Sequence, residues 1–304
     1  MLCRIFGLDL SPETNPDHVR CTSLDLGQNL VKSNIKDLLI VALDIEGVDT
    51  GQLLGEGNFQ IGLSILDTRC ICSSSPEQYL LQSYNFCVGS PDYCTKAVRK
   101  FSFGQSEDAK IEELRTKIQE LVVGRNIILV VHGGKYDVLF LKDIDIDLCP
   151  LYVLDTQKAA QHPLDLDHRC TLQELLILLK CPFGSLHVAG NEATFTLRAL
   201  LLLVILNSSK ESDLSDEQRR LFSTFETTAK IPPPLNRNQE EAEIFTQKRK
   251  EKRRNRLAKR ARKKERKEKR KIEPNTYIDE SYDDWSCLSV VFYDLTLGIC
   301  GKGA

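Results

Sequence analysis

The sequence predicts an α/β domain, with a mixed sheet flanked by helices, over residues 37–210. Two observations lead to this fold class. Short apolar runs of strand length alternate with longer segments in which apolar residues recur at helical spacing. Three strands come first and strand–helix pairs follow, an order that favours a mixed sheet. Hydrophobic residues make up 41% of the chain, which is ordinary for a protein with a packed core.

The first strand is predicted at residues 38–47, where six apolar residues run without a break into Asp44 and Glu46. Side chains two apart in a strand point to the same side of the sheet. An ionised carboxylate at the end of a buried strand is costly unless it is paired or bound to a cation. The triplet Asp-x-Glu alone is a weak signal, because composition gives it about once in a chain of this length.

The remaining elements follow from periodicity and from turn or capping residues. A long helix is predicted from Ser106, with Glu107 and Asp108 in its first turn, to Gly124. The capping box of Thr171 and Glu174 begins another helix. Further strands are predicted at 59–67, within 79–88, at 126–131 and at 151–154, and further helices at 132–141, 171–180 and 191–206.

Outside this domain the sequence predicts four segments. Residues 1–36 form an irregular lead-in, and residues 211–247 form a linker marked by three consecutive prolines. A basic arm, helical or disordered, follows at 248–271, and residues 272–304 form a C-terminal tail of unassigned role.

Composition limits where the protein acts. The eleven cysteines are scattered, which favours reduced thiols in an intracellular protein. No basic stretch followed by an apolar one begins the chain, so we expect no secretory signal. The longest apolar run, 199–206, is far shorter than the roughly 18 residues of a membrane span. We therefore expect a soluble protein with no membrane partner, in the nucleus, the cytoplasm or both.

Two later acids lie in segments that the order of strands and helices can bring close to Asp44 and Glu46. Asp137 comes after the fourth strand, and Glu192 begins the last helix of the domain. Strand ends gather functional groups in open α/β sheets, so these acids can converge with Asp44 and Glu46. Four carboxylates in one cleft repel each other unless cations neutralise them. Mg²⁺ or Mn²⁺ suits such oxygen ligands, and two ions about 3.5 to 4 Å apart would clamp a phosphodiester.

His187 adds a group that can accept a proton from an attacking water near neutral pH. Each residue also has a plainer interpretation. Asp137 and Glu192 suit the first turn of a helix by charge, and His187 suits a loop. Their joint order is what favours a catalytic site.

Three segments carry a family resemblance: VALDIE at 41–46, VVHGGKYDVLFL at 130–141 and HVAGNEA at 187–193. They resemble the motifs of the DEDDh 3′-to-5′ exonucleases, the DnaQ-like branch of the ribonuclease H-like superfamily, and a fungal subgroup with the third motif H-x-A-G-N-D-A most of all. The resemblance implies a ribonuclease H-like fold over about 38–206, two-metal hydrolysis of RNA or single-stranded DNA, and metal ligation by Asp44, Glu46, Asp137 and Glu192. It also implies that His187 is the general base.

Two positions depart from the family pattern. Glu192 stands where Asp is usual, and Gly133 replaces the Asn that commonly follows the histidine of the second motif. These departures leave a second hypothesis open: a catalytically impaired protein that keeps the fold and serves as a nucleic-acid-binding or ribonucleoprotein adaptor.

The basic arm carries 17 Lys or Arg and three Glu, whereas the whole chain has a net charge of −2, so the rest of the chain is acidic. A solvated helix is one interpretation. The charge density favours contact with nucleic-acid phosphates or with a nuclear import receptor. The expected phosphate-binding residues are Arg253, Arg254, Arg256, Lys259, Arg260, Arg262, Lys263 and Lys264.

Overall fold

The computed structural model describes residues 5–8, 25–47, 57–71, 80–208 and 214–234, together with 254, 255 and 258. The chain divides into two compact units, 1–243 and 244–304, and every strand and helix described below lies in the first. The predicted C-terminal tail lies outside the described residues, as does most of the basic arm.

A six-stranded mixed sheet forms the centre of the first unit, in the order β4-β3-β2-β1-β5-β6. Strand β2 is antiparallel to both of its neighbours, β1 and β3, whereas β5 runs parallel to β1 and to β6, and β4 runs parallel to β3. This confirms the predicted α/β class. The strands are β1 (Leu39–Glu46), β2 (Phe59–Asp67), β3 (Leu81–Val88), β4 (Ser106–Asp108), β5 (Ile127–Val131) and β6 (Tyr152–Asp155).

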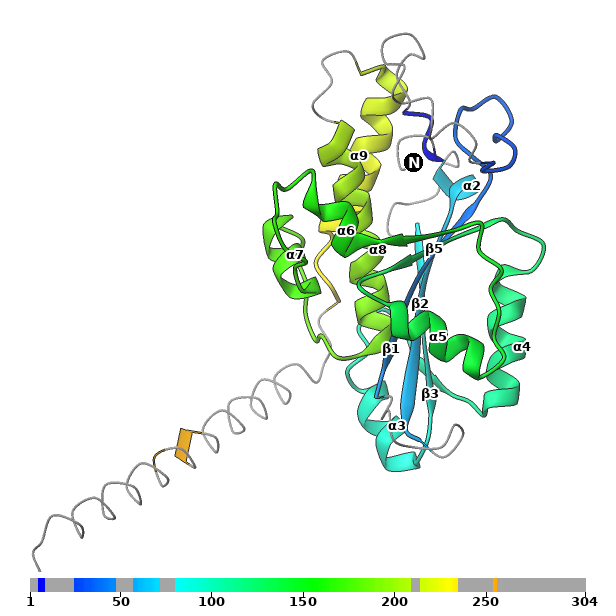
Figure 1. Ribbon diagram of the computed structural model, residues 1–304, viewed down its shortest axis with the longest axis vertical. Coiled ribbons are helices and arrows are strands. Elements are labelled where there is room, and N and C mark those ends of the chain that lie inside the picture. The colour runs from blue at the N-terminus through cyan, green and yellow to red at the C-terminus, as the bar shows by residue number, and fades with distance from the viewer. Residues whose placement is uncertain are drawn as a thin grey trace, which may run out of the picture. The chain divides into compact units, whose positions relative to one another are not determined.

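Helices cover both faces of the sheet (Figure 1). Alternate residues of β1 face opposite sides: Ile40 and Ala42 pack with α8 and α9, whereas Val41 and Leu43 pack with α4 and α5. The helices are α2 (Thr68–Ile71), α3 (Pro91–Val98), α4 (Ile111–Val122), α5 (Lys135–Asp143), α6 (Thr156–Gln161), α7 (Leu172–Leu178), α8 (Ala189–Ser208) and α9 (Asp216–Lys230).

Helix α8 is the central helix of the fold, and it is apolar on nearly every side. It packs against β1, β2 and β3 on one side and against α9 on the other (Figure 1). Among the described residues it is the one helix whose length and composition would allow a membrane crossing, but 83% of its apolar window is buried within the protein. An all-round apolar helix of this kind is typical of a core.

The structure corrects the predicted start of the helix at Ser106. Residues Ser106–Asp108 form strand β4, because their backbone pairs with β3 from Asn85 to Cys87. Helix α4 begins only at Ile111, and Glu112 and Glu113 supply the acids of its first turn. Pairing with a distant strand therefore overrides a local helix signal.

The structure also corrects the predicted linker at 211–247, since helix α9 occupies 216–230. Its buried face contains Leu221, Phe222, Phe225 and Ala229 at helical spacing. The lead-in contributes to the same core, in which Ile5, Phe6, Leu8 and Leu26 are buried. The ring centroid of Phe6 lies 4.8 Å from that of Phe225.

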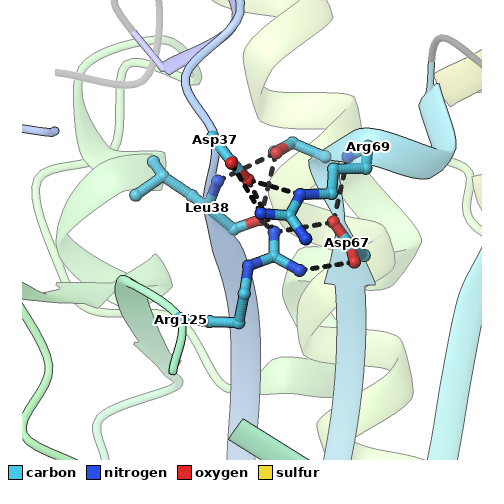
Figure 2. A network of polar contacts seen from close by, with 6 residues as sticks. Asp37, Leu38, Asp67, Arg69 and Arg125 are labelled. Carbon is cyan, nitrogen blue, oxygen red and sulfur yellow. Dashed lines mark hydrogen bonds and ion pairs between the residues drawn. The ribbon is translucent and has the colours of Figure 1, made fainter. Parts of the chain in front are cut away.

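A network of ion pairs closes the sheet where β1 begins and β2 ends (Figure 2). Arg125 bonds Asp67 at 2.7 Å and Asp37 at 2.8 Å, and Arg69 bonds Asp37 at 2.7 Å. The hydrogen bond from Arg69, followed by the nearby arginine charges, lowers the pKa of Asp37 despite some burial. Burial alone would raise the pKa of Asp67, but its bonds to Arg125 and Arg69 lower it. These carboxylates are therefore compensated by the protein itself.

Candidate active site

The site forms where β1 ends, because β2 allows α8 to approach closely there. Asp44 lies opposite Gly62 in the β1–β2 register. A side chain at Gly62 would overlap the backbone carbonyl of Ala189, the first residue of α8. The glycine thus lets the start of α8 rest directly on β2. Glu192, in the first turn of α8, is delivered beside Asp44 and Glu46 by this contact.

A second close approach fixes the start of α8 on β3. A Cβ atom at Gly190 would lie 2.6 Å from the ring of Phe101 and 2.7 Å from Cβ of Asn85. The Gly190 N–H donates to Oδ1 of Asn85 at 2.8 Å. Asn85 is buried and its amide also donates to Ser106 Oγ at 2.7 Å. The helix end is therefore anchored by a buried hydrogen bond as well as by packing.

Glu46, His187 and Glu192 form the open side of the site. Their potential ligand atoms all lie within 4.8 Å of one another. Nδ1 of His187 is 3.6 Å from Oε1 of Glu46 and 3.7 Å from Oε1 of Glu192. The imidazole is 86% exposed, whereas the Glu46 and Glu192 side chains are 29% and 15% exposed. The histidine thus faces solvent above two half-buried carboxylates.

Asp44 and Asp137 lie deeper in the same cluster. Burial, followed by the charges of Glu192, Asp137 and Glu46, raises the pKa of Asp44 well above its ordinary value. Its Oδ2 atom is buried and has no hydrogen-bond partner in the described structure. Burial, then the charges of Glu46 and Glu192, raises the pKa of Asp137 to about 6. The structure therefore brings together the four acids that the sequence analysis singled out.

No arginine or lysine of the described residues forms an ion pair with these four acids. Burial, followed by the charge of Glu192, raises the pKa of Glu46, and the nearby His187 offsets part of that effect. Uncompensated carboxylates at this density repel one another in the absence of a cation. The donor set consists of oxygens with one imidazole, and it fits hard divalent ions.

Both departures from the family motifs have a local structural cause. Gly133 has a positive φ of 71°, and a Cβ atom there would lie 2.7 Å from Oε1 of Gln157. A glycine therefore suits this turn. The extra methylene of Glu192 lets its Oε1 accept the His187 N–H at 2.6 Å. His132, in the same second motif, lies outside the cluster and contacts Thr156 at 2.8 Å and the Cys170 carbonyl at 3.1 Å.

The residues that assemble the site are not among those predicted from the sequence. Gly62, Asn85 and Asn191 hold the start of α8, and the available signals were a glycine and an asparagine inside strands and an asparagine beside Glu192. Of the expected phosphate-binding residues, Arg254 alone is described, and it is exposed. The other seven, Arg253, Arg256, Lys259, Arg260, Arg262, Lys263 and Lys264, lie outside the described residues.

A six-stranded mixed sheet with a cluster of carboxylates at the end of strand β1 is the arrangement that the ribonuclease H-like resemblance implies. The chain belongs to the DEDDh exonuclease family, because the family model described as "DNA polymerase III subunit epsilon-like, C-terminal domain" matches residues 39–203, more than half of the chain. This family generally uses divalent metal ions.

Comparison with solved structures finds a similarity to the structure titled "Exonuclease X in complex with 5′ overhanging duplex DNA". The sequence identity is 15% and the TM-score is 0.35, with 61% of this chain and 99% of that chain covered. No curated protein sequence matches the chain.

Proposed function

We propose that this protein is a metal-dependent 3′-to-5′ exonuclease that hydrolyses phosphodiester bonds of RNA or single-stranded DNA. The observation that carries the proposal is the set of four acids, which have no lysine or arginine partner among the described residues, and in which the buried Oδ2 of Asp44 makes no hydrogen bond there. Carboxylates are kept in such an environment when a cation from outside the chain neutralises them. Membership of a DEDDh exonuclease family supports the same reaction class.

The residues fit two Mg²⁺ or Mn²⁺ ions, which Asp44, Glu46, Asp137 and Glu192 would hold. When bound, such ions neutralise the acids, activate a water and stabilise the charge on the leaving oxygen. His187 accepts the proton of the attacking water. Its Nδ1 faces the carboxylates of Glu46 and Glu192, which favours a proton on Nδ1 and leaves Nε2 free to act as the base.

The test is degradation of end-labelled single-stranded RNA and DNA by the full-length protein in Mn²⁺ or in EDTA. We expect metal-dependent shortening from the 3′ end that Asp44→Ala abolishes. The comparison of the two substrates assigns the preference for RNA or DNA. Shortening of the substrate from the 5′ end, or activity that survives Asp44→Ala, would contradict the proposal.

The basic arm supports a further part of the proposal. We assign nucleic-acid contact to its eight named residues and nuclear localisation, through an import receptor, to the arm as a whole, with the cytoplasm as a second location. Each lost phosphate contact reduces the slope of log affinity against log salt by about 0.7 for a single strand. Replacing the eight residues by Gln should therefore flatten the salt dependence of binding.

We also propose that the chain belongs to the fungal subgroup of the family, because its third motif resembles the motif of that subgroup.

Glu192 favours one alternative function, a catalytically impaired adaptor that binds nucleic acid or a ribonucleoprotein. The observation behind this alternative is that Glu192, whose side chain is one methylene longer, stands where the family usually has Asp. Glu192→Asp separates the two functions. Activity that appears only in Glu192→Asp would favour the adaptor, and activity in the unaltered protein would exclude it.

A further inference from the structure

Asn191, which precedes Glu192, is fully buried and uses its whole side chain in hydrogen bonds. Its Nδ2 donates to the Ser185 carbonyl at 2.7 Å and to the Lys100 carbonyl at 2.9 Å. Its Oδ1 accepts the Ser102 N–H at 2.9 Å. An amide offers two donors on one atom, and here the two bonds reach different loops. Asn191 thus joins the first turn of α8 to two separate segments of the chain.

One of those segments carries His187, whose backbone has a positive φ of 65°. This left-handed conformation is unfavourable for a residue other than glycine, and it persists only where the surroundings enforce it. The bond from Asn191 to Ser185 holds the loop two residues before His187. The His187 N–H is held by Glu192 at 2.6 Å.

The other side of the loop is held by the backbone of the same helix turn. The N–H groups of Asn191 and Glu192 donate to the Val188 carbonyl at 2.9 and 3.0 Å. The loop is therefore fixed on both sides of His187 by residues 191 and 192. Asn191 contributes through its side chain at Ser185 and through its backbone at Val188.

We propose that Asn191 is a positioning residue for His187, and that it holds His187 in its left-handed conformation beside Glu46 and Glu192. The inference rests on the proposed function for its kinetic consequences. The side chain of Asn191 is fully buried, so it is out of reach of a substrate at the surface. Its effect on the reaction passes through the loop at 185–188 and therefore through His187.

The kinetic test uses Asn191→Asp and Asn191→Ala. The aspartate keeps the acceptor for the Ser102 N–H but loses both donors, whereas the alanine loses the acceptor and both donors without adding charge. Loss of a residue that orients a site group should lower kcat by about 10- to 100-fold and change KM less than about threefold. In a His187→Ala background the same substitutions should change kcat by less than about threefold, because coupled residues are not additive. Equal losses in both backgrounds would overturn the inference.

A structural readout decides the inference without nuclease activity. Amide exchange of the His187 N–H, followed by NMR, should become about tenfold faster or more in Asn191→Asp. The control is Leu200→Ala, which removes a fully buried side chain about two turns further along α8 and lowers global stability while it keeps every hydrogen bond of Asn191. Leu200→Ala should leave kcat unchanged. It should also leave unchanged the exchange rate of the His187 N–H when this rate is compared with the exchange rate expected from global unfolding. If the unaltered protein degrades no nucleic acid, the proposed function fails, whereas unchanged His187 exchange in Asn191→Asp refutes the positioning role.

Discussion

The two ends of strand β1 both carry acidic residues, but their environments are opposite. At the beginning of the strand, Asp37 and the neighbouring Asp67 are bound by Arg125 and Arg69, and their pKa values are lowered (Figure 2). At the end of the strand, Asp44 and Glu46 lie among other acids, and their pKa values are raised. The same type of side chain is neutralised by the protein at one end and left uncompensated at the other.

This difference separates structural acids from functional ones. Ion pairs within the chain tie β1, β2 and the segment before β5 together and need nothing from solution. The acid cluster has a cost in the metal-free protein, which binding of cations relieves. Functional sites commonly carry such destabilising arrangements. The environment of a carboxylate, rather than its identity, indicates its role.

The largest expected effect is that of Asp44→Asn. The substitution removes a proposed metal ligand, so metal-dependent hydrolysis should fall by about 100-fold or more. Because it also removes an uncompensated buried acid, the metal-free protein should become more stable by about 1 kcal/mol. Nuclease assays and urea unfolding in EDTA measure the two effects. Asp145→Asn, at an exposed carboxylate, is the control, and a loss of stability in Asp44→Asn would break the comparison.

Arg125→Ala tests the other end of the strand. The side chain of Arg125 is 14% exposed and its guanidinium bonds two carboxylates, so its removal takes a partner from both acids. We expect a loss of about 2 kcal/mol, between the values typical of buried and of exposed ion pairs. Arg115→Ala, whose partner Asp145 is 79% exposed, should cost less than about 1 kcal/mol. Equal losses in the two variants would contradict the structural role of Arg125.

Glu192→Asp sharpens the description of the acid end. Shortening the side chain withdraws Oε1 from the His187 N–H, which it accepts at 2.6 Å. We therefore expect kcat to fall by about tenfold, the cost of one charged hydrogen bond. Single-turnover rates in Mn²⁺ measure the change. A rate that increases would show that Glu192 is a poorer ligand than the usual Asp and that the His187 contact does not contribute.

The smallest expected effect is the pH dependence of stability in EDTA. In the folded protein Asp137 holds its proton up to about pH 6, above its ordinary pKa of 3.8, so stability falls as pH rises between these values. Asp37 and Asp67 have lowered pKa values, so their contribution is complete above 3.8 and is lost at lower pH. The metal-free protein should therefore be most stable between about pH 4 and 5.

Divalent metal should reverse the upper part of this profile. Bound ions favour ionised ligands, so Mn²⁺ should stabilise the protein more at pH 7 than at pH 5. Thermal unfolding across this range, with EDTA and with Mn²⁺, measures both curves. A metal-free stability that rises steadily to pH 7 would contradict the uncompensated state of the cluster.

The sequence by itself determined the strands that carry the site and the identity of its acids. The short, β-branched-containing apolar run before Asp44 favours a buried strand, and alternation along that strand then sets the side to which Asp44 and Glu46 point. The capping box at Thr171 likewise needs only neighbouring residues. These signals are local, and the corresponding elements formed where the sequence predicts them.

Only the tertiary structure decided how the acids meet and what holds them. Strand β4 forms at Ser106 because β3 pairs with it, and α9 forms the outer layer because the apolar surface of α8 needs a cover. The bond between Asn85 and Gly190 joins residues 105 apart, and the contact at Gly62 depends on the absence of a side chain. Such contacts depend on distances between remote segments, and local periodicity contains no information about them.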